Sequence, residues 1–195
     1  MSIYVINGKP GVGKDRFCSN VIDIMGSEKA AVFSTVDGVK TIAKLFGWNG
    51  KKDGKARRFL SNLKKTLAEW NDFPVEHTIA KVENFLQEVE KNGYPGCSEH
   101  AAVFIMCREP EEIRRLCETL NAKSILVKRH IYDDMETSNK SDEDVFNYEY
   151  DILIENNGDL QDLAALAIDF VKDENLFFKN WKDLKIAETG EIYYN

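Results

Sequence analysis

A glycine-rich stretch near the N-terminus, GKPGVGKD at residues 8–15, constrains the fold of this chain more than any other segment. Its spacing fits the pattern G-x-x-x-x-G-K-[ST] at every position except the last, where Asp15 replaces a hydroxyl residue. The preceding residues 3–7 are apolar and β-branched, which predicts a buried strand, and residues 14–25 carry apolar side chains at helical spacing. Strand, glycine loop and helix therefore follow one another in the order that a phosphate-binding loop requires.

In such a loop the glycines let the backbone turn tightly, so that several N–H groups point at phosphate oxygens beside the positive end of the helix. Lys14 would reach the transferable phosphate as a point charge, and Pro10 would stiffen the loop. The alternative is a glycine-rich turn with an accidental lysine, but the flanking strand and helix favour phosphate binding. The residues that we expect to contact a nucleotide here are Gly8, Lys9, Pro10, Gly11, Val12, Gly13, Lys14, Asp15 and Arg16.

The residue that closes the motif, Asp15, has two interpretations. A carboxylate binds Mg²⁺ directly or through water, and in that role Asp15 would support phosphate binding only together with the metal. Alternatively, Asp15 is an early-turn acid that stabilises the N-terminus of its helix. We favour the metal role.

Strand-like and helix-like runs alternate along the chain. The predicted strands are residues 3–7, 30–35, 101–107, 124–128 and 151–154. The predicted helices are residues 14–25, 39–46, 55–71, 77–91, 110–121 and 160–171. This alternation predicts an α/β fold with a five-stranded, mostly parallel sheet flanked by helices.

Ligands of parallel α/β sheets bind beyond the carboxyl ends of the strands. The glycine loop, Arg108 and Arg129 all follow predicted strand ends, so we expect them to converge on one rim. Arg57 and Arg58 begin a helix after the second strand, and a planar guanidinium is suited to phosphate because it binds two oxygens at once. A surface ion pair is the alternative for each arginine. Asp37 is a further candidate for binding a substrate.

Charge is distributed unevenly. The chain carries a net −7, which argues against a general nucleic-acid binder. Residues 51–65, KKDGKARRFLSNLKK, hold seven Lys/Arg and one Asp, a local charge of +6. This basic patch indicates either a focused anion site or a solvated helix face, and the sequence does not separate the two.

Other sequence signals exclude several classes of protein. The four cysteines form no C-x-x-C pair and have no histidine at ligand spacing, which argues against structural zinc and disulfides and favours a reduced cytoplasm. No apolar run is long enough to span a bilayer, no secretory signal is visible, and we expect no membrane partner. Residues 139–142 read NKSD, as in the guanine-reading motif of GTPases, but they lie in an acidic loop instead of ending a strand, so we interpret the match as chance.

Four segments together resemble one group of enzymes. Residues 8–15 resemble the G-x-x-x-S-G-K-D loop of the bacteriophage-type deoxynucleoside monophosphate kinases and of animal phosphomevalonate kinase. RRFLSNL at 57–63 is similar to R-R-L-x-Q-x-L of the phage-type kinases, and residues 107–129 to their strand-end T-R, acidic helix, next strand and terminal Arg. Residues 151–163 resemble D-x-x-I-x-N-x-G-x-L-x-x-L of both families. The matches follow in the right order over most of residues 3–171.

The resemblance implies a P-loop NTPase fold of the nucleoside monophosphate kinase type, with ATP and Mg²⁺ as cofactors and a small phosphate-bearing acceptor, and it leaves a homodimer open. Its implied organisation is a kinase domain at residues 1–172, with an acceptor-binding helical part at 40–95 and a lid-like loop at 129–149, followed by a tail at 173–195.

The implied roles follow residue by residue. Gly8, Gly11, Gly13 and Lys14 would hold the ATP phosphates, Asp15 the metal, and Arg57, Arg58 and Arg108 the acceptor or transferred group, while Arg129 would act from the lid and Asn156, Asn157 and Gly158 would border the adenine. Of these, Lys14, Arg108 and Arg129 would be catalytic.

The sequence departs from the resembled pattern at Met106, where these kinases have an Asp two residues before the strand-end Arg. Glu99, Glu109 and Asp37 are candidates to replace that acid. Three hypotheses remain: a nucleoside or deoxynucleoside monophosphate kinase, a nucleotide-binding regulator with little activity, and a kinase for a non-nucleotide phosphorylated molecule.

The variant Met106→Asp separates an active from a decayed kinase. If the missing acid limits catalysis, we expect a large gain in turnover, because the restored carboxylate would help to order the metal or the acceptor. Turnover measured by coupled ADP release is the readout, and an unchanged rate would indicate that another residue already has this role.

Overall fold

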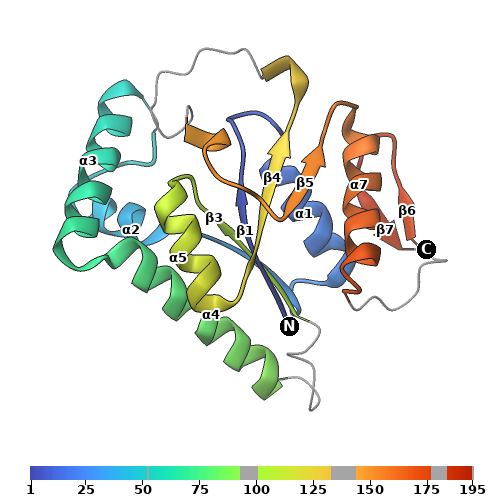
Figure 1. Cartoon of the computed structure of the whole chain (residues 1–195), viewed down its shortest axis with the longest axis horizontal. Helices are drawn as coiled ribbons and strands as arrows, with labels where there is room; N and C mark the ends of the chain where they lie inside the picture. The colour runs from blue at the N-terminus through green and yellow to red at the C-terminus, as the bar shows by residue number, and fades with distance from the viewer. Residues whose placement is uncertain (52, 93–100, 133–143, 177–183, 195) are drawn as a thin grey trace.

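The sheet at the centre of the molecule has the parallel arrangement that the sequence predicts. The computed structural model describes residues 1–51, 53–92, 101–132, 144–176 and 184–194. The five-stranded sheet has the order β2-β3-β1-β4-β5, and all its neighbouring strands are parallel. Its strands are β1 (Ser2–Asn7), β2 (Ala30–Ser34), β3 (Ala102–Met106), β4 (Lys123–Lys128) and β5 (Ile152–Glu155). The carboxyl ends of all five therefore meet at one edge of the sheet (Figure 1).

Helices connect these strands in chain order. They are α1 (Lys14–Met25), α2 (Asp37–Leu45), α3 (Gly54–Asn71), α4 (Phe73–Asn92), α5 (Pro110–Leu120) and α7 (Leu160–Asp173). Pro110 begins α5, where its missing N–H costs no intrahelical bond, and Asn121 ends it in the left-handed conformation. Both features confirm the predicted limits of that helix.

The core has two halves because successive residues of β1 point to opposite faces of the sheet. On one face, Tyr4 and Phe104 pack with Phe17 of α1 and Phe170 of α7, and the Tyr4 ring centroid lies 5.3 Å from Phe104 and 5.1 Å from Phe170. On the other face, Ile3 and Val5 of β1 join apolar side chains of α4 and α5.

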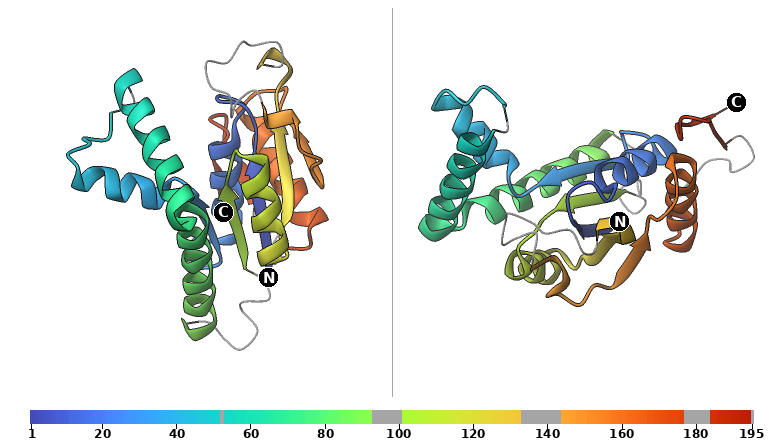
Figure 2. Two further views of the ribbon diagram at one scale, coloured as in Figure 1. Left: turned by 60° about the vertical axis from the view of Figure 1, so that its left-hand side comes forward. Right: turned by 90° about the horizontal axis from the view of Figure 1, so that it is seen from above.

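Helices α2 and α3 project to one side of the sheet, where α4 joins them (Figure 2). Helix α3 forms as the sequence predicts, with the Asp53 carboxylate accepting a hydrogen bond from Ala56 N at 2.8 Å. Its apolar stripe does not reach the core, however. None of its residues is fully buried, and the Trp70 side chain is 80% exposed, because α3 packs mainly on its neighbours α2 and α4.

The tail docks where the sequence could not place it. Strands β6 (Leu184–Ile186) and β7 (Ile192–Tyr194) form an antiparallel hairpin beside α1 and α7. The Tyr194 hydroxyl donates a hydrogen bond to Ile24 O, and Ile192 joins the core on that side. The predicted lid is bounded by two single-turn helices, η2 (His130–Tyr132) and η3 (Asp144–Phe146), while the NKSD stretch lies outside the described residues.

No helix in the described part of the chain combines the length and the apolar character needed to cross a membrane.

Core packing predicts a sharp contrast between two aromatic residues. Phe170→Ala removes a ring that is only 6% exposed and should lower the free energy of unfolding by about 3–5 kcal/mol. Trp70→Ala removes a ring that is 80% exposed and should change it by less than about 0.5 kcal/mol. Urea unfolding followed by circular dichroism measures both. Equal losses would mean that the aromatic cluster is not the main core.

Candidate functional site

Three glycines of the loop between β1 and α1 have positive φ, and at two of them a side chain would also clash with neighbouring atoms. Gly8 has φ 147°, and a Cβ placed there would lie 2.3 Å from the backbone oxygen of Val127 in β4. Gly13 has φ 101°, and its Cβ would lie 2.5 Å from Nδ2 of Asn156. Both φ values lie where side chains are disfavoured. These glycines therefore allow a tight turn that packs closely against β4 and against the residue that follows β5.

Lys14 begins α1, and its ammonium group turns back into the loop. It donates hydrogen bonds to Gly8 O at 2.6 Å and to Lys9 O at 2.9 Å. The positive charge thus lies within the glycine turn, next to the positive end of the α1 dipole. This concentration of positive potential suits a phosphate group.

Both ends of the predicted lid contact the loop at Lys9. The buried Lys9 ammonium donates to Tyr132 O of η2 at 3.0 Å and lies 5.5 Å from the ring centroid of Phe146 in η3. The Tyr132 ring also packs close to Gly11. Segments 130–132 and 144–146 therefore lie beside the loop, although the residues between them, 133–143, are outside the described ones.

Two asparagines, one at the end of β1 and one directly after β5, form hydrogen bonds with the loop. Asn156, after β5, donates from Nδ2 to Val12 O at 2.8 Å and is buried, so its amide supports the loop backbone. Asn7, at the end of β1, accepts from Gly8 N at 2.8 Å and donates to Arg108 O at 3.2 Å and to the Tyr150 hydroxyl at 2.8 Å. The sequence reasoning missed Asn7 and Tyr150. A polar residue that ends an apolar strand beside a glycine loop was the available signal for Asn7.

The predicted site residues of β3, β4 and β5 come together at the rim. Arg108 follows β3 and is tied to the start of the loop through Asn7. Arg129 follows β4, and its NH2 group donates to Gly158 O at 3.1 Å. Oδ1 of Asn157 accepts a hydrogen bond from His130 N at 2.9 Å. The expected convergence of these strand ends on one rim is therefore confirmed, while the ligand assigned to each residue stays a prediction.

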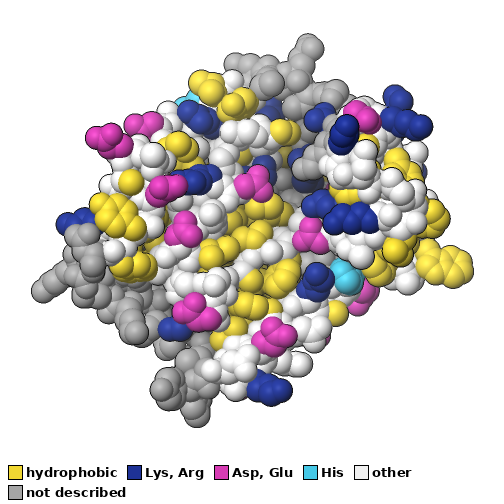
Figure 3. Space-filling model, turned by 180° about the vertical axis from the view of Figure 1, so that it is seen from behind, with side chains coloured by type: hydrophobic (Ala, Val, Ile, Leu, Met, Phe, Trp, Pro, Cys, Tyr) yellow, Lys and Arg dark blue, Asp and Glu magenta, His cyan; other side chains and the backbone are white. Residues whose placement is uncertain are grey.

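The candidates on α2 and α3 are more dispersed. Asp37 begins α2 after β2, where its carboxylate accepts from Ser34 N at 2.9 Å and pairs with Lys40 at 3.0 Å. Arg57 and Arg58 are both exposed on α3. On the face of the molecule shown in Figure 3, Lys and Arg side chains gather on the side formed by α2 and α3. Exposed residues of this basic region are Lys44, Lys51, Lys55, Arg57, Arg58 and Lys65.

A partly buried ionic cluster lies at the turn from β3 to α5, where the Lys64, Glu112 and Glu109 side chains are 12%, 14% and 37% exposed. The Lys64 ammonium of α3 bridges Glu109, at 2.6 Å, and Glu112, at 2.8 Å, and the Cys107 thiol donates to Glu112 at 3.3 Å. Burial tends to lower the pKa of Lys64, but the two carboxylates outweigh it and raise that pKa. Burial and the Glu112 charge raise the pKa of the Cys107 thiol well above its usual range.

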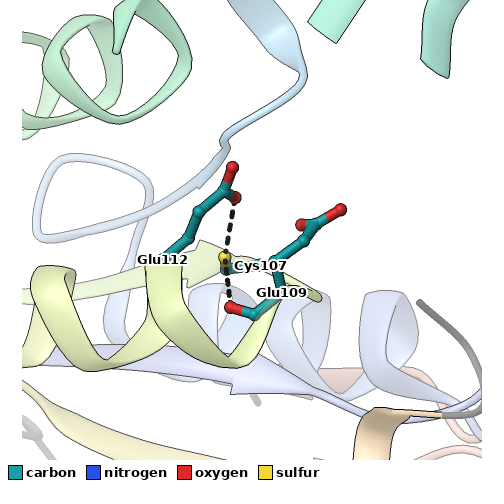
Figure 4. A group of neighbouring side chains, drawn as sticks. All are labelled: Cys107, Glu109 and Glu112. Atoms are coloured by element: carbon teal, nitrogen blue, oxygen red, sulfur yellow. Dashed lines mark hydrogen bonds between the residues drawn. The ribbon is translucent and has the colours of Figure 1, made fainter. Parts of the chain in front are cut away.

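The pKa values of the two carboxyl groups in this cluster shift in opposite directions. Burial acts to raise the pKa of Glu109, but its close pairing with Lys64 lowers that pKa below its usual value. Burial and the neighbouring Glu109 charge raise the pKa of Glu112, although Lys64 opposes them. Cys107, Glu109 and Glu112 lie close enough to share a cation (Figure 4). The Lys64 ammonium already supplies the positive charge there, so we do not assign a metal to them.

Several polar side-chain atoms around the loop could bind a nucleotide and its metal ion. Nε of Arg16, Nε of Arg129 and Oδ1 of Asn156 are buried and have no hydrogen-bond partner among the described residues. Unpaired buried polar atoms are rare, and these belong to residues around the loop. Asp15 is exposed in the first turn of α1, and a carboxylate is a ligand that Mg²⁺ accepts. The residues present therefore fit a nucleotide phosphate with a divalent ion.

The chain has an α/β fold, with a glycine loop between the central strand of its parallel sheet and the following helix. No protein-family model matches the sequence, and no curated protein matches it. Among solved structures, the chain is similar to the tunicamycin resistance protein of Deinococcus radiodurans, with 14% identity, a TM-score of 0.47, and coverage of 92% of this chain and 98% of that one.

Two other similar structures come from Chloroflexus aurantiacus and Thermus thermophilus. The first, described as a candidate kinase, is 9% identical with a TM-score of 0.46 over 88% of this chain and 96% of that one. The second, TT1252, is 19% identical with a TM-score of 0.41 over 89% and 97%. Similarities at these TM-scores do not indicate an activity. The function proposed below rests on the glycine loop.

The tight packing at Gly8 gives a testable prediction. Gly8→Ala forces a Cβ against the Val127 carbonyl and should lower the free energy of unfolding by about 1–3 kcal/mol. ATP affinity should fall as well, because the loop backbone must move. The matched control is Gly54→Ala at the start of α3, where a Cβ meets nothing within 4 Å. Urea unfolding and calorimetric ATP titration measure the two effects, and equal behaviour of both variants would contradict the assigned loop geometry.

Proposed function

We propose that this chain is an ATP-dependent phosphotransferase that moves the γ-phosphoryl group of ATP to a phosphate-bearing small molecule. A nucleoside or deoxynucleoside monophosphate is the acceptor class that we place first. The observation that carries the proposal is the tight glycine loop between β1 and α1, with the Lys14 ammonium turned into it. This combination supports phosphate binding through backbone N–H groups, a helix N-terminus and a point charge.

Phosphoryl transfer needs little beyond positioning and neutralisation of charge on the migrating group. Lys14 would neutralise charge on the β- and γ-phosphates and hold the γ-phosphate in line with the acceptor. Arg108, tied to the start of the loop through Asn7, would bind the acceptor or the transferred group from the neighbouring strand end. Arg129, on the other side of β1, would add charge from the lid.

When bound, Mg²⁺ would supply positive charge that neutralises the phosphates. Asp15 is the residue that we propose to hold it, directly or through water, because it directly follows Lys14 and is exposed. Asn157 and Gly158, which follow β5, are proposed to border the adenine, with Asn156 supporting the loop beneath. Arg57 and Arg58 are proposed to bind the acceptor from α3.

A second candidate function is nucleotide binding with little catalysis. It is favoured by Met106, a half-buried apolar residue at the carboxyl end of β3, where an acid would be useful to a kinase. A non-nucleotide phosphorylated acceptor is a third candidate, because arginines and loop N–H groups recognise any phosphate.

A screen for coupled ADP release over all nucleoside and deoxynucleoside monophosphates, with ATP and Mg²⁺, tests the proposal. We expect turnover with at least one monophosphate, and Lys14→Ala should lower kcat/KM by about 10²–10³, because it removes a charge that stabilises the transferring group. Removal of the metal with EDTA should abolish turnover.

The control for this screen is ATP binding measured without an acceptor. Wild-type protein that binds ATP and phosphorylates no monophosphate would contradict nucleotide kinase activity and would favour the second candidate function. Phosphorylated alcohols tested in the same assay would then address the third.

A further inference from the structure

Helix α3 carries the arginines proposed for the acceptor, yet it is loosely anchored. No residue of α3 is fully buried, so apolar packing restrains it weakly. Among the described Lys and Arg residues of segment 51–65, all are exposed except Lys64. The Lys64 side chain is only 12% exposed and points to the start of α5.

The contacts of Lys64 differ in kind from those of its neighbour. Lys64 reaches Glu109 at 2.6 Å and Glu112 at 2.8 Å, both in another segment of the chain. Lys65 is 76% exposed and pairs at 3.7 Å with Glu69 of its own helix, a geometry that adds little stability. Breaking the Lys64–Glu112 pair, whose side chains are 12% and 14% exposed, would leave a largely buried charge uncompensated, and this cost restrains both segments.

The bridge connects two segments that each carry a proposed acceptor arginine. Arg57 precedes Lys64 by seven residues, which places both on nearly the same side of α3, about 10 Å apart along its axis. Glu109 directly follows Arg108 in the chain. Arg58 lies about 100° around the helix from Arg57, so Arg57 is the one of the two that shares a side of α3 with Lys64.

We propose that Lys64 is a positioning residue, whose bridge to Glu109 and Glu112 sets the distance between Arg57 and Arg108 on either side of the acceptor phosphate. This inference rests on the proposed phosphotransferase function. The carboxylates of Glu109 and Glu112 rise on the same side of α5, so that one ammonium meets both (Figure 4). Lys64 contributes no charge to the acceptor itself, because the two carboxylates already engage it.

Kinetics of Lys64→Met test this role. The KM for the acceptor should rise about tenfold with kcat within about twofold, because misplacing α3 weakens acceptor binding more than the chemical step. The KM for ATP should not change, since the glycine loop is untouched. Lys64→Arg keeps the charge and should restore most of the acceptor affinity.

Lys65→Met is the matched control, because it removes the same charge from the same basic region. It should behave as wild type, since the ion pair of Lys65 lies within α3 and does not bridge this helix to another segment. The double variant Lys64→Met/Glu112→Gln removes the ammonium and the more buried of its two carboxylates, so that only the more exposed Glu109 is left unpaired, which limits misfolding. It should also show the raised acceptor KM. An acceptor KM that changes equally in the Lys64 and Lys65 variants, or that changes in parallel with the ATP KM, would overturn the proposal.

Hydrogen exchange of the α3 amides adds a readout that needs no turnover. Exchange in α3 should be faster in Lys64→Met than in Lys65→Met, since the bridge to α5 is lost. Equal exchange rates would overturn the bridge. If exchange is faster in Lys64→Met but the wild-type protein phosphorylates no acceptor, the bridge is supported and the proposed function is contradicted. The two failures are therefore distinguishable.

Discussion

The rim of this protein depends on the close approach of two backbones, Gly8 at the end of β1 and Val127 in β4. A side chain at Gly8 would meet the Val127 carbonyl at 2.3 Å, so the chain can leave the centre of the sheet here only through glycine. The loop therefore starts between β3 and β4, where the neighbouring strand ends can reach it. This turn also fixes the positions of Lys14 and of the N-terminus of α1, which begins directly after it.

Polar contacts hold the two sides of the rim differently. On the loop side, Asn7 and Asn156 bond to backbone groups, and such contacts leave the loop little freedom. On the side of α3, which has no fully buried residue, the Lys64 bridge joins that helix to the start of α5. The glycine loop is thus held by hydrogen bonds to its backbone, while α3 is held to α5 by an ionic bridge.

The sequence predicted the strands, the helices and the parallel order of the fold because these depend on local periodicity and on the right-handed connection of strands. It also predicted that the glycine loop, Arg108 and Arg129 meet at one rim, because each follows a strand end, and the structure places them there. It missed Asn7 and Tyr150, and it assigned Asn156 to the adenine without its contact to Val12 O. These contacts join residues more than a hundred positions apart, so no local pattern encodes them.

By itself the sequence determined that this chain builds a parallel α/β sheet with a glycine loop after its central strand, because glycine spacing and apolar periodicity act over a few residues. Only the tertiary structure decided which polar groups meet. Lys64 is one lysine in a basic run, and Lys65 beside it has the same chemistry and a different environment. The difference arises from which side of α3 faces α5, and helix packing sets that orientation.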